Sequence, residues 1–250
     1  MIILYVKHSR LTLEYPDSTK IWRYMDFTKF VNLLDTESLF FCRADKFEDK
    51  WEGIFPKKMI DEFNLDKKNI KSNDGNEYSW CEWQIVKEAR SHLINCWHVN
   101  EHESDAMWKL YSSNRQSIAI QSTIERLKNC FNKTNERIWI GQVEYVDFMI
   151  WKPNNRVFNM GEPNTLKTFF LKRKGFEHEK EIRAITNIAY NDHKQEKGIL
   201  VDIDLSELVE TIVISPISEG WFFNLTSNII KKYSYKFSVK KSELGIQSYM

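Results

Sequence analysis

The segment from Cys96 to Thr123 constrains the fold most, because a helix and a strand follow one another within it. Ser104 is typical of a helix start, where a side-chain oxygen accepts hydrogen bonds from unpaired backbone N–H groups. Residues 117–123 then have the apolar run of a short strand. Such a helix and strand can form the floor of a pocket, although spacing alone favours a core helix that happens to carry Trp108. One face of this helix holds apolar side chains at the i, i+3 and i+4 positions: Met107, Leu110 and Tyr111.

The remaining patterns mix helices and strands without regular strand–helix–strand spacing. An amphipathic helix begins after Asp26, and a second helix is expected over residues 219–232. Strands are expected at residues 21–25, 39–43, 138–146, 182–188, 198–205, 211–214 and 233–239. The sequence therefore predicts an α+β fold, as a single domain over residues 1–250. Its sheet is expected to be mixed, mostly antiparallel and flanked by helices.

The composition narrows the classes of function. The 36 basic and 35 acidic side chains give a net charge of +1, so no overall field directs the chain to nucleic acid or membrane. Aromatic residues make up 14%, with nine Trp, which favours pockets or stacking surfaces. No glycine-rich phosphate loop occurs, and the four cysteines form no CxxC pair. Together with the lack of an apolar run long enough for a membrane span, this predicts a soluble cytoplasmic protein with free thiols.

Residues 172–185 form the second unusual segment, KRKGFEHEKEIRAI. If a strand begins near Glu179, then Glu179, Glu181 and Arg183 share one of its faces. They then form either a solvated charged face or a carboxylate that Arg183 holds at the edge of a pocket. A carboxylate in that position can act as a base or stabilise a cationic transition state. The basic run from Lys172 to Lys174 is either a phosphate contact or a solvated loop.

Arg23 and Tyr24 lie on the first expected strand. Burying an arginine between two aromatic residues is costly without a partner, so Arg23 should contact a carboxylate or a bound anion. The acidic loop from Asp45 to Glu52 lacks the spacing of a calcium loop, and we expect no metal there. His98 and His102 lack an HExxH pattern, so hydrogen bonding within a polar loop is the expected role of His98.

Taken together, several segments resemble the uncharacterised bacterial family catalogued as DUF2971. The resemblance covers about residues 21–215 and appears in order along the chain. It consists of the strand Ile21–Tyr24, the strand and acidic loop Leu39–Gly53, the pair Cys96–Trp97, the run Met107–Tyr111 before Ile118–Ile120, and the block Phe176–Arg183.

A further resemblance is to ADP-ribosyltransferases. It rests on a basic-aromatic pair on the first strand, a strand ending in Ser-Thr, and a late Glu-x-Glu strand. It implies that NAD is a substrate and that no metal is needed. Arg23 would hold NAD, Glu181 would stabilise the positive charge on the ribose, and Glu179 would orient the acceptor. The implied NAD-binding residues, including the aromatic side chains that could stack on nicotinamide, are Arg23, Tyr24, Trp108, Tyr111 and Arg183.

The alternative is a non-catalytic module that binds a nucleotide or a protein, for instance in a phage-defence or toxin system. Under the enzyme hypothesis, the partners are a nucleotide ligand and a protein or nucleic-acid acceptor, with no membrane. That hypothesis requires Arg23, Trp108 or Tyr111, and Glu181 to line one cleft. Under the alternative, Glu179, Glu181 and Arg183 form structural ion pairs.

Overall fold

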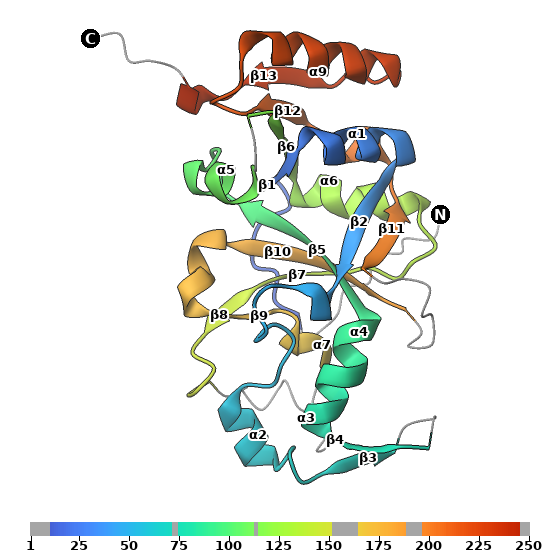
Figure 1. The fold of residues 1–250 in the computed structure, drawn as a ribbon, viewed down its shortest axis with the longest axis vertical. Helices are drawn as coiled ribbons and strands as arrows, with labels where there is room; N and C mark the ends of the chain where they lie inside the picture. The colour runs from blue at the N-terminus through green and yellow to red at the C-terminus, as the bar shows by residue number, and fades with distance from the viewer. Residues whose placement is uncertain (1–10, 72–74, 113–114, 152–164, 189–196, 246–250) are drawn as a thin grey trace, which may run out of the picture.

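The computed structural model of the chain describes residues 11–71, 75–112, 115–151, 165–188 and 197–245 (Figure 1). Within these residues the main sheet has nine strands, and helices pack against it. Neighbouring strands run antiparallel except for the parallel pair β12–β13. The predicted fold class, an α+β single domain with a mixed and mostly antiparallel sheet, is confirmed.

The strands of the main sheet are β1 (Lys20–Asp26), β2 (Ser38–Arg43), β5 (His92–Val99), β6 (Ser117–Thr123), β7 (Trp139–Gln142), β10 (Glu181–Asn187), β11 (Gly198–Asp202), β12 (Thr211–Ile214) and β13 (Ser238–Lys241). The short strands β3 (Asn69–Lys71) and β4 (Glu77–Ser79) form a hairpin, and β8 (Glu144–Val146) pairs with β9 (Leu171–Arg173). The last strand differs from the sequence prediction, because it begins at Ser238 instead of Tyr233.

The helices are α1 (Phe27–Thr36), α2 (Lys57–Phe63), α3 (Trp80–Trp83), α4 (Ala89–Ser91), α5 (Asp105–Tyr111), α6 (Ile124–Asn129), α7 (Thr165–Thr168), α8 (Leu205–Leu208) and α9 (Gly220–Lys232). A π-helical turn, Gln84–Glu88, joins α3 to α4. Ser104 begins α5 as predicted, because its side chain accepts a hydrogen bond from the Met107 backbone N–H. No helix in the described ranges is long and apolar enough to cross a membrane.

The main sheet forks at β5. One edge of β5 pairs with β10 along its length, from His92 to His98. The opposite edge is shared by two strands: β1 pairs at residues 98–99, and β2 pairs at residues 93–94. Figure 1 shows the result, with β2 and β11 leaving β5 on one side and β1 and β6 on the other. Residues 95–97 therefore face a gap between two diverging strands.

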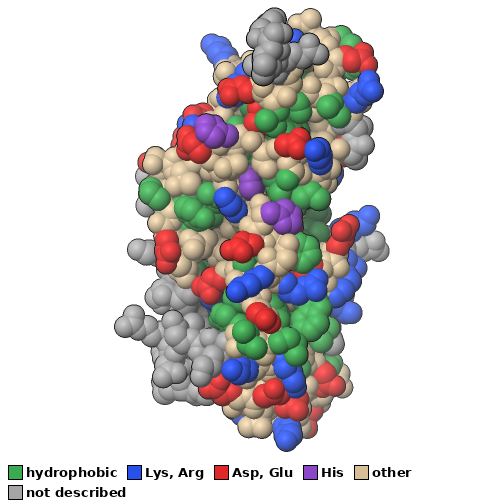
Figure 2. All heavy atoms as spheres, turned by 90° about the vertical axis from the view of Figure 1, so that its left-hand side faces the viewer, with side chains coloured by type: hydrophobic (Ala, Val, Ile, Leu, Met, Phe, Trp, Pro, Cys, Tyr) green, Lys and Arg blue, Asp and Glu red, His purple; other side chains and the backbone are tan. Residues whose placement is uncertain are grey.

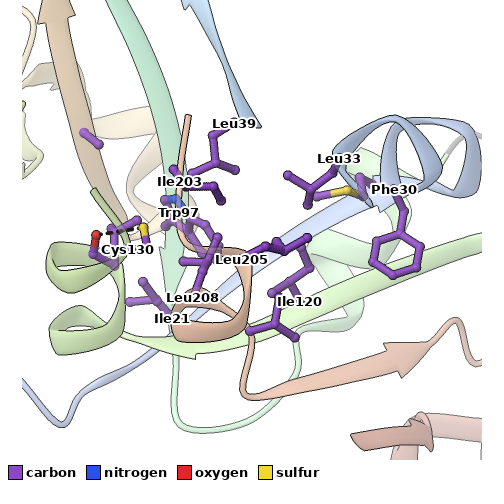
Figure 3. Packing of buried hydrophobic residues seen from close by; sticks show 14 of the residues in the cluster. Ile21, Phe30, Leu33, Leu39, Trp97, Ile120, Cys130, Ile203, Leu205 and Leu208 are labelled. Carbon is purple, nitrogen blue, oxygen red and sulfur yellow. Dashed lines mark hydrogen bonds between the residues drawn. The ribbon is translucent and has the colours of Figure 1, made fainter. Parts of the chain in front are cut away.

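The main core fills the side of the sheet that α1, α6 and α8 cover. Ile21, Trp97 and Ile120 of the sheet meet apolar side chains of these helices (Figure 3). The α1 helix buries Phe30, Leu33 and Leu34. Phe30 and Leu34 lie on the face that the sequence spacing predicts, whereas Leu33 lies beside it. A second, smaller cluster lies on the opposite side, where Trp22 and Tyr24 pack against Met107 and Trp108 of α5. The sheet is therefore packed on both sides near the fork.

Adjacent phenylalanines on β2 test this assignment of the core. Phe41 is fully buried and meets Phe131 edge to face, whereas Phe40 is 43% exposed on the other side of the strand. We expect Phe41→Ala to lower the free energy of unfolding by about 3–5 kcal/mol, because it removes buried surface and leaves a cavity. The matched Phe40→Ala variant should lose about 1 kcal/mol or less. Urea unfolding of both variants measures the difference, and equal losses would contradict the assignment.

Candidate functional site

Arg23 lies at the fork. Its Nη1 donates a hydrogen bond to the Cys96 carbonyl at 2.6 Å, in the gap that β1 leaves beside β5, and its Cζ lies 6.0 Å from the centre of the Trp97 ring. Burial lowers the pKa of Arg23, although a guanidinium stays protonated at neutral pH. No carboxylate of the described residues forms an ion pair with it. Of the two expected partners, a carboxylate and a bound anion, the described chain does not supply the first.

Five charged side chains form a buried cluster below the fork, which we call the carboxylate cluster: Glu52, Lys172, Glu179, Glu181 and Arg183. Lys172 Nζ lies 2.6 Å from Glu179 Oε2 and 2.7 Å from Glu181 Oε1. Arg183 Nε lies 2.7 Å from Glu181 Oε2, and its Nη2 lies 2.5 Å from Glu52. Each member is less than 9% exposed, so the charges are not a solvated face.

Local sequence explains how the cluster forms. Glu181 and Arg183 alternate along β10 and share a face, as predicted. The strand does not extend back to Glu179, because Glu179 lies in a 3-10 turn (Lys174–Glu179) that ends at Lys180 in the left-handed region. This turn reverses the chain after β9, so that Glu179 reaches Lys172. The turn, and not alternation along a strand, therefore explains the position of Glu179.

Glu52 comes from the acidic loop, far away in sequence. The next residue, Gly53, has a φ of +77°, and an added Cβ would lie 2.4 Å from the Phe169 ring. Only glycine fits this close approach in the left-handed region. The Gly53 carbonyl accepts hydrogen bonds from Gln84 at 2.6 Å and from Thr168 at 3.1 Å, which fixes the end of the loop. Glu52 is thereby placed against Lys172 and Arg183.

Two other carboxylates of the acidic loop have cationic partners. Asp45 pairs with Arg43 at 2.9 Å, and Asp49 pairs with Arg173 at 2.9 Å. Over the part of the chain that the structure describes, no group of three or more His, Cys, Asp or Glu side chains is placed to hold a metal ion. The loop therefore contributes to ion pairs, and its last carboxylate contributes to the cluster.

The cluster contains two cations and three carboxylates, so one carboxylate lacks a compensating charge. Burial alone would raise the pKa of Glu181, but Arg183, a hydrogen bond with Glu179 and Lys172 hold that pKa well below its usual value. Burial, followed by the hydrogen bond and charge of Glu181, raises the pKa of Glu179 to about 7. The two side chains thus behave as a pair in which Glu181 stays ionised, while Glu179 is protonated below about pH 7 and ionised above it.

Tyr111 lies at the end of α5, and its phenol is influenced by charges of the carboxylate cluster. Its side chain is 48% exposed. Burial of the phenol raises the pKa of Tyr111, and the charges of Glu179 and Glu181 raise it further. The charge of the Tyr111 phenol in turn raises the pKa of Arg23, against the larger effect of burial. Tyr111 is therefore a half-exposed aromatic side chain whose pKa depends on the charges of the carboxylate cluster.

The other two predicted stacking residues are enclosed. Tyr24 is 7% exposed and Trp108 is 3% exposed, and their rings meet edge to face at 4.9 Å. The Tyr24 hydroxyl accepts a hydrogen bond from the Ser104 backbone N–H, and the Trp108 indole donates one to Glu103. Both rings thus pack α5 onto the sheet. Arg183 is likewise enclosed, because it contacts Glu52, Glu181 and the Phe169 carbonyl.

Sequence reasoning missed His98 as a member of this site. It lies on β5 and not in a polar loop, directly between Trp22 of β1 and Glu181 of β10. Residues that oppose one another in antiparallel strands share a face, so these three form a row across the sheet. The His98 Nδ1 lies 2.6 Å from the Glu179 carbonyl. Only the strand register could reveal this row, since its members lie far apart in sequence.

The side of the molecule that carries α5, the turn before β10 and β8 faces the viewer in Figure 2. Acidic and basic side chains form a band across the middle of this face, with hydrophobic side chains above and below the band. The exposed Tyr111, with Leu110 at 58% exposure beside it, contributes apolar surface to α5. The face therefore combines apolar contact area with charge, as sites for nucleotides do.

Comparison with known proteins establishes no family for the chain. No family model matches it, and no curated protein does. Among solved structures, Thermus sp. 2.9 DarT in complex with NAD+ is similar over 93% of this chain and 100% of that chain, with 8% identity and a TM-score of 0.41. The same protein in complex with ADP-ribosylated ssDNA is similar over 95% and 100%, with 8% identity and a TM-score of 0.42. A likeness at this level establishes neither a shared fold nor a shared activity.

The charge balance of the cluster predicts a large effect of Glu181→Gln on stability. Glu181 makes short contacts to both Lys172 and Arg183, so its loss removes one direct carboxylate contact from each of these buried cations. We expect the free energy of unfolding to fall by about 3–5 kcal/mol. Glu177→Gln, in the exposed part of the same turn, is the matched control and should change it by less than about 0.5 kcal/mol. Thermal and urea unfolding compare the two, and a small loss for Glu181→Gln would show that the ion pairs are dispensable.

The raised pKa of Glu179 predicts a dependence of stability on pH. The folded chain binds this proton more tightly than the unfolded chain. The contribution of Glu179 to the free energy of unfolding is therefore fully present below about pH 4.5 and is lost as the pH rises through about 7. The Glu179→Gln variant, which is neutral at every pH, should not show this loss. The free energy of unfolding of both proteins at pH 5 and pH 8 measures it. Equal changes in the two proteins would place the proton elsewhere.

Proposed function

We propose that the protein is an enzyme that uses NAD as a donor of ADP-ribose, either to an acceptor or to water. The observation that carries the proposal is the position of Arg23 beside β5, where it donates to the carbonyl of Cys96, the residue that lies opposite Arg183 of the carboxylate cluster in β10. An anion-binding cation, an exposed ring and a carboxyl pair are the three elements that this chemistry requires. They come from β1, α5 and the start of β10.

Arg23 is proposed to bind the diphosphate of NAD. A guanidinium has five N–H donors, and the Cys96 carbonyl is the acceptor that the described chain gives it. Burial makes an uncompensated cation costly, so an anion that reaches the fork gains a strong, charge-assisted contact. Lys172 is less suited to this role, because three carboxylates already surround it.

Tyr111 is proposed to stack on the nicotinamide ring. Tyr24 and Trp108, the other candidates from the sequence, have enclosed rings that offer little surface to a ligand. The ring of Tyr111 is about half exposed and lies in the field of the carboxyl pair. A planar, positively charged ring that stacks there would be attracted both by the aromatic face and by the nearby carboxylates.

The carboxyl pair is proposed to act on the bond between the ribose C1′ and the nicotinamide nitrogen. When this bond breaks, its electron pair leaves with nicotinamide, and positive charge develops on the ribose. A nearby carboxylate stabilises that charge. An acceptor hydroxyl or water then attacks C1′ and gives its proton to Glu179, whose pKa of about 7 suits a base at neutral pH. Glu181, held by Lys172 and Arg183, orients Glu179 and supplies fixed negative charge.

One observation favours the second candidate, a non-catalytic module that binds a nucleotide or a protein. Glu179, Glu181 and Arg183 are joined by buried contacts, which is the arrangement that this hypothesis expects. A binding module would use Arg23 and Tyr111 for a nucleotide and the carboxylate cluster only for stability. The two hypotheses differ in one respect, namely whether the bond to nicotinamide is broken.

Nicotinamide release by the purified chain tests the proposal. We expect release from NAD by the wild-type protein, with a rate that rises as the pH increases through about 7. Glu179→Gln should reduce the rate at least about 100-fold, because it removes the base while keeping the size of the side chain. Glu177→Gln, an exposed neighbour in the same turn, should keep the wild-type rate. Chromatography of the products measures the release, with cell lysate added as a source of acceptors.

The control for folding is a thermal unfolding curve of each variant. Glu179→Gln is a sharper variant than Glu181→Gln, because Glu181 compensates two buried cations and its loss threatens the fold itself. If the wild-type protein binds NAD but releases no nicotinamide with any lysate, the binding-module hypothesis replaces the enzyme hypothesis.

A further inference from the structure

His98 has one ring nitrogen bonded and the other without a partner. Its Nδ1 lies 2.6 Å from the Glu179 carbonyl oxygen. A carbonyl can only accept, so Nδ1 carries the proton and donates it. The Nε2 atom therefore has a lone pair in the neutral ring, and burial lowers the pKa of His98, which keeps the ring neutral. This Nε2 atom is buried and has no hydrogen-bond partner among the described residues.

An orphaned acceptor in this place is significant for two reasons. A buried polar atom without a partner is costly, and most such atoms in native proteins are satisfied. His98 also lies beside Glu181 in the row across β1, β5 and β10, on the face that carries the carboxyl pair. Facing side chains in such a row have their Cβ atoms roughly 5 Å apart. His98 and Glu181 are therefore direct neighbours on that face.

We propose that His98 Nε2 accepts a hydrogen bond from a neutral donor of the ligand, a ribose hydroxyl or the carboxamide N–H. The inference rests on the proposed function and adds a contact that fixes the ligand. Because Nδ1 of the same ring holds the Glu179 carbonyl, the imidazole connects this contact to the turn that carries Glu179. His98 thus recognises the ligand with one nitrogen and positions Glu179 with the other.

Two substitutions distinguish the roles of the two ring nitrogens of His98. His98→Asn places an amide donor where Nδ1 lies, so it keeps the bond to the Glu179 carbonyl but lacks the distal acceptor. His98→Gln reaches the position of Nε2 with its amide oxygen but gives up the bond to Glu179. We expect His98→Asn to bind NAD about tenfold more weakly than the wild-type chain, the factor typical of one lost hydrogen bond. His98→Gln should keep most of the affinity and instead lower the melting temperature.

Calorimetric titration of the full chain with ADP-ribose and with NAD provides the measurement. A loss of affinity for both ligands assigns the donor to a ribose hydroxyl, whereas a loss for NAD alone assigns it to the carboxamide. Wild-type affinity in His98→Asn, or equal losses in the two variants, would overturn the inference and leave the proposed function intact. If the wild-type chain binds neither ligand, the proposed function fails and the inference fails with it.

Discussion

The buried guanidinium of Arg183 is the interaction on which the site depends. The side chain has no exposed surface, yet it carries a full charge. Such a charge is tolerated only when it is paired and hydrogen-bonded, and here it meets Glu52, Glu181 and the Phe169 carbonyl. These partners lie on the acidic loop, on β10 and beside β9. One cation therefore fixes three separate parts of the chain against one another.

That arrangement leaves an excess of one carboxylate, and the proposed chemistry depends on this excess. A cluster of two cations and two carboxylates would be closed and inert. The third carboxylate, Glu179, is attached through a turn and not through the sheet, so its environment differs from that of Glu181. Neighbouring carboxyl groups with separated pKa values are a recurring basis for acid–base roles in enzymes. Under the proposed function, structural ion pairs and the reacting carboxyl belong to the same cluster.

The fork in the sheet supplies the second half of the site. If β1 paired with β5 over its whole length, the Cys96 carbonyl would take part in a continuous ladder and would leave no place for Arg23. Because β2 takes the other part of the same edge, the strands diverge and the arginine side chain occupies the gap. An open edge inside a sheet is unusual, since unpaired backbone groups need partners. Here a charged side chain is one of those partners.

The sequence by itself determined the elements and several of their faces: the apolar stripe of α1, the Ser104 start of α5, and the alternation that places Glu181 beside Arg183. These are local properties, set by backbone geometry and by the period of the side chains. It also selected Arg23, Tyr111, Glu179 and Glu181 as candidates for chemistry. Only the tertiary structure decided that Glu52 joins Lys172 and that His98 lies between Trp22 and Glu181. Strand register and loop closure set these contacts between distant residues, and the period of a sequence carries no information about either.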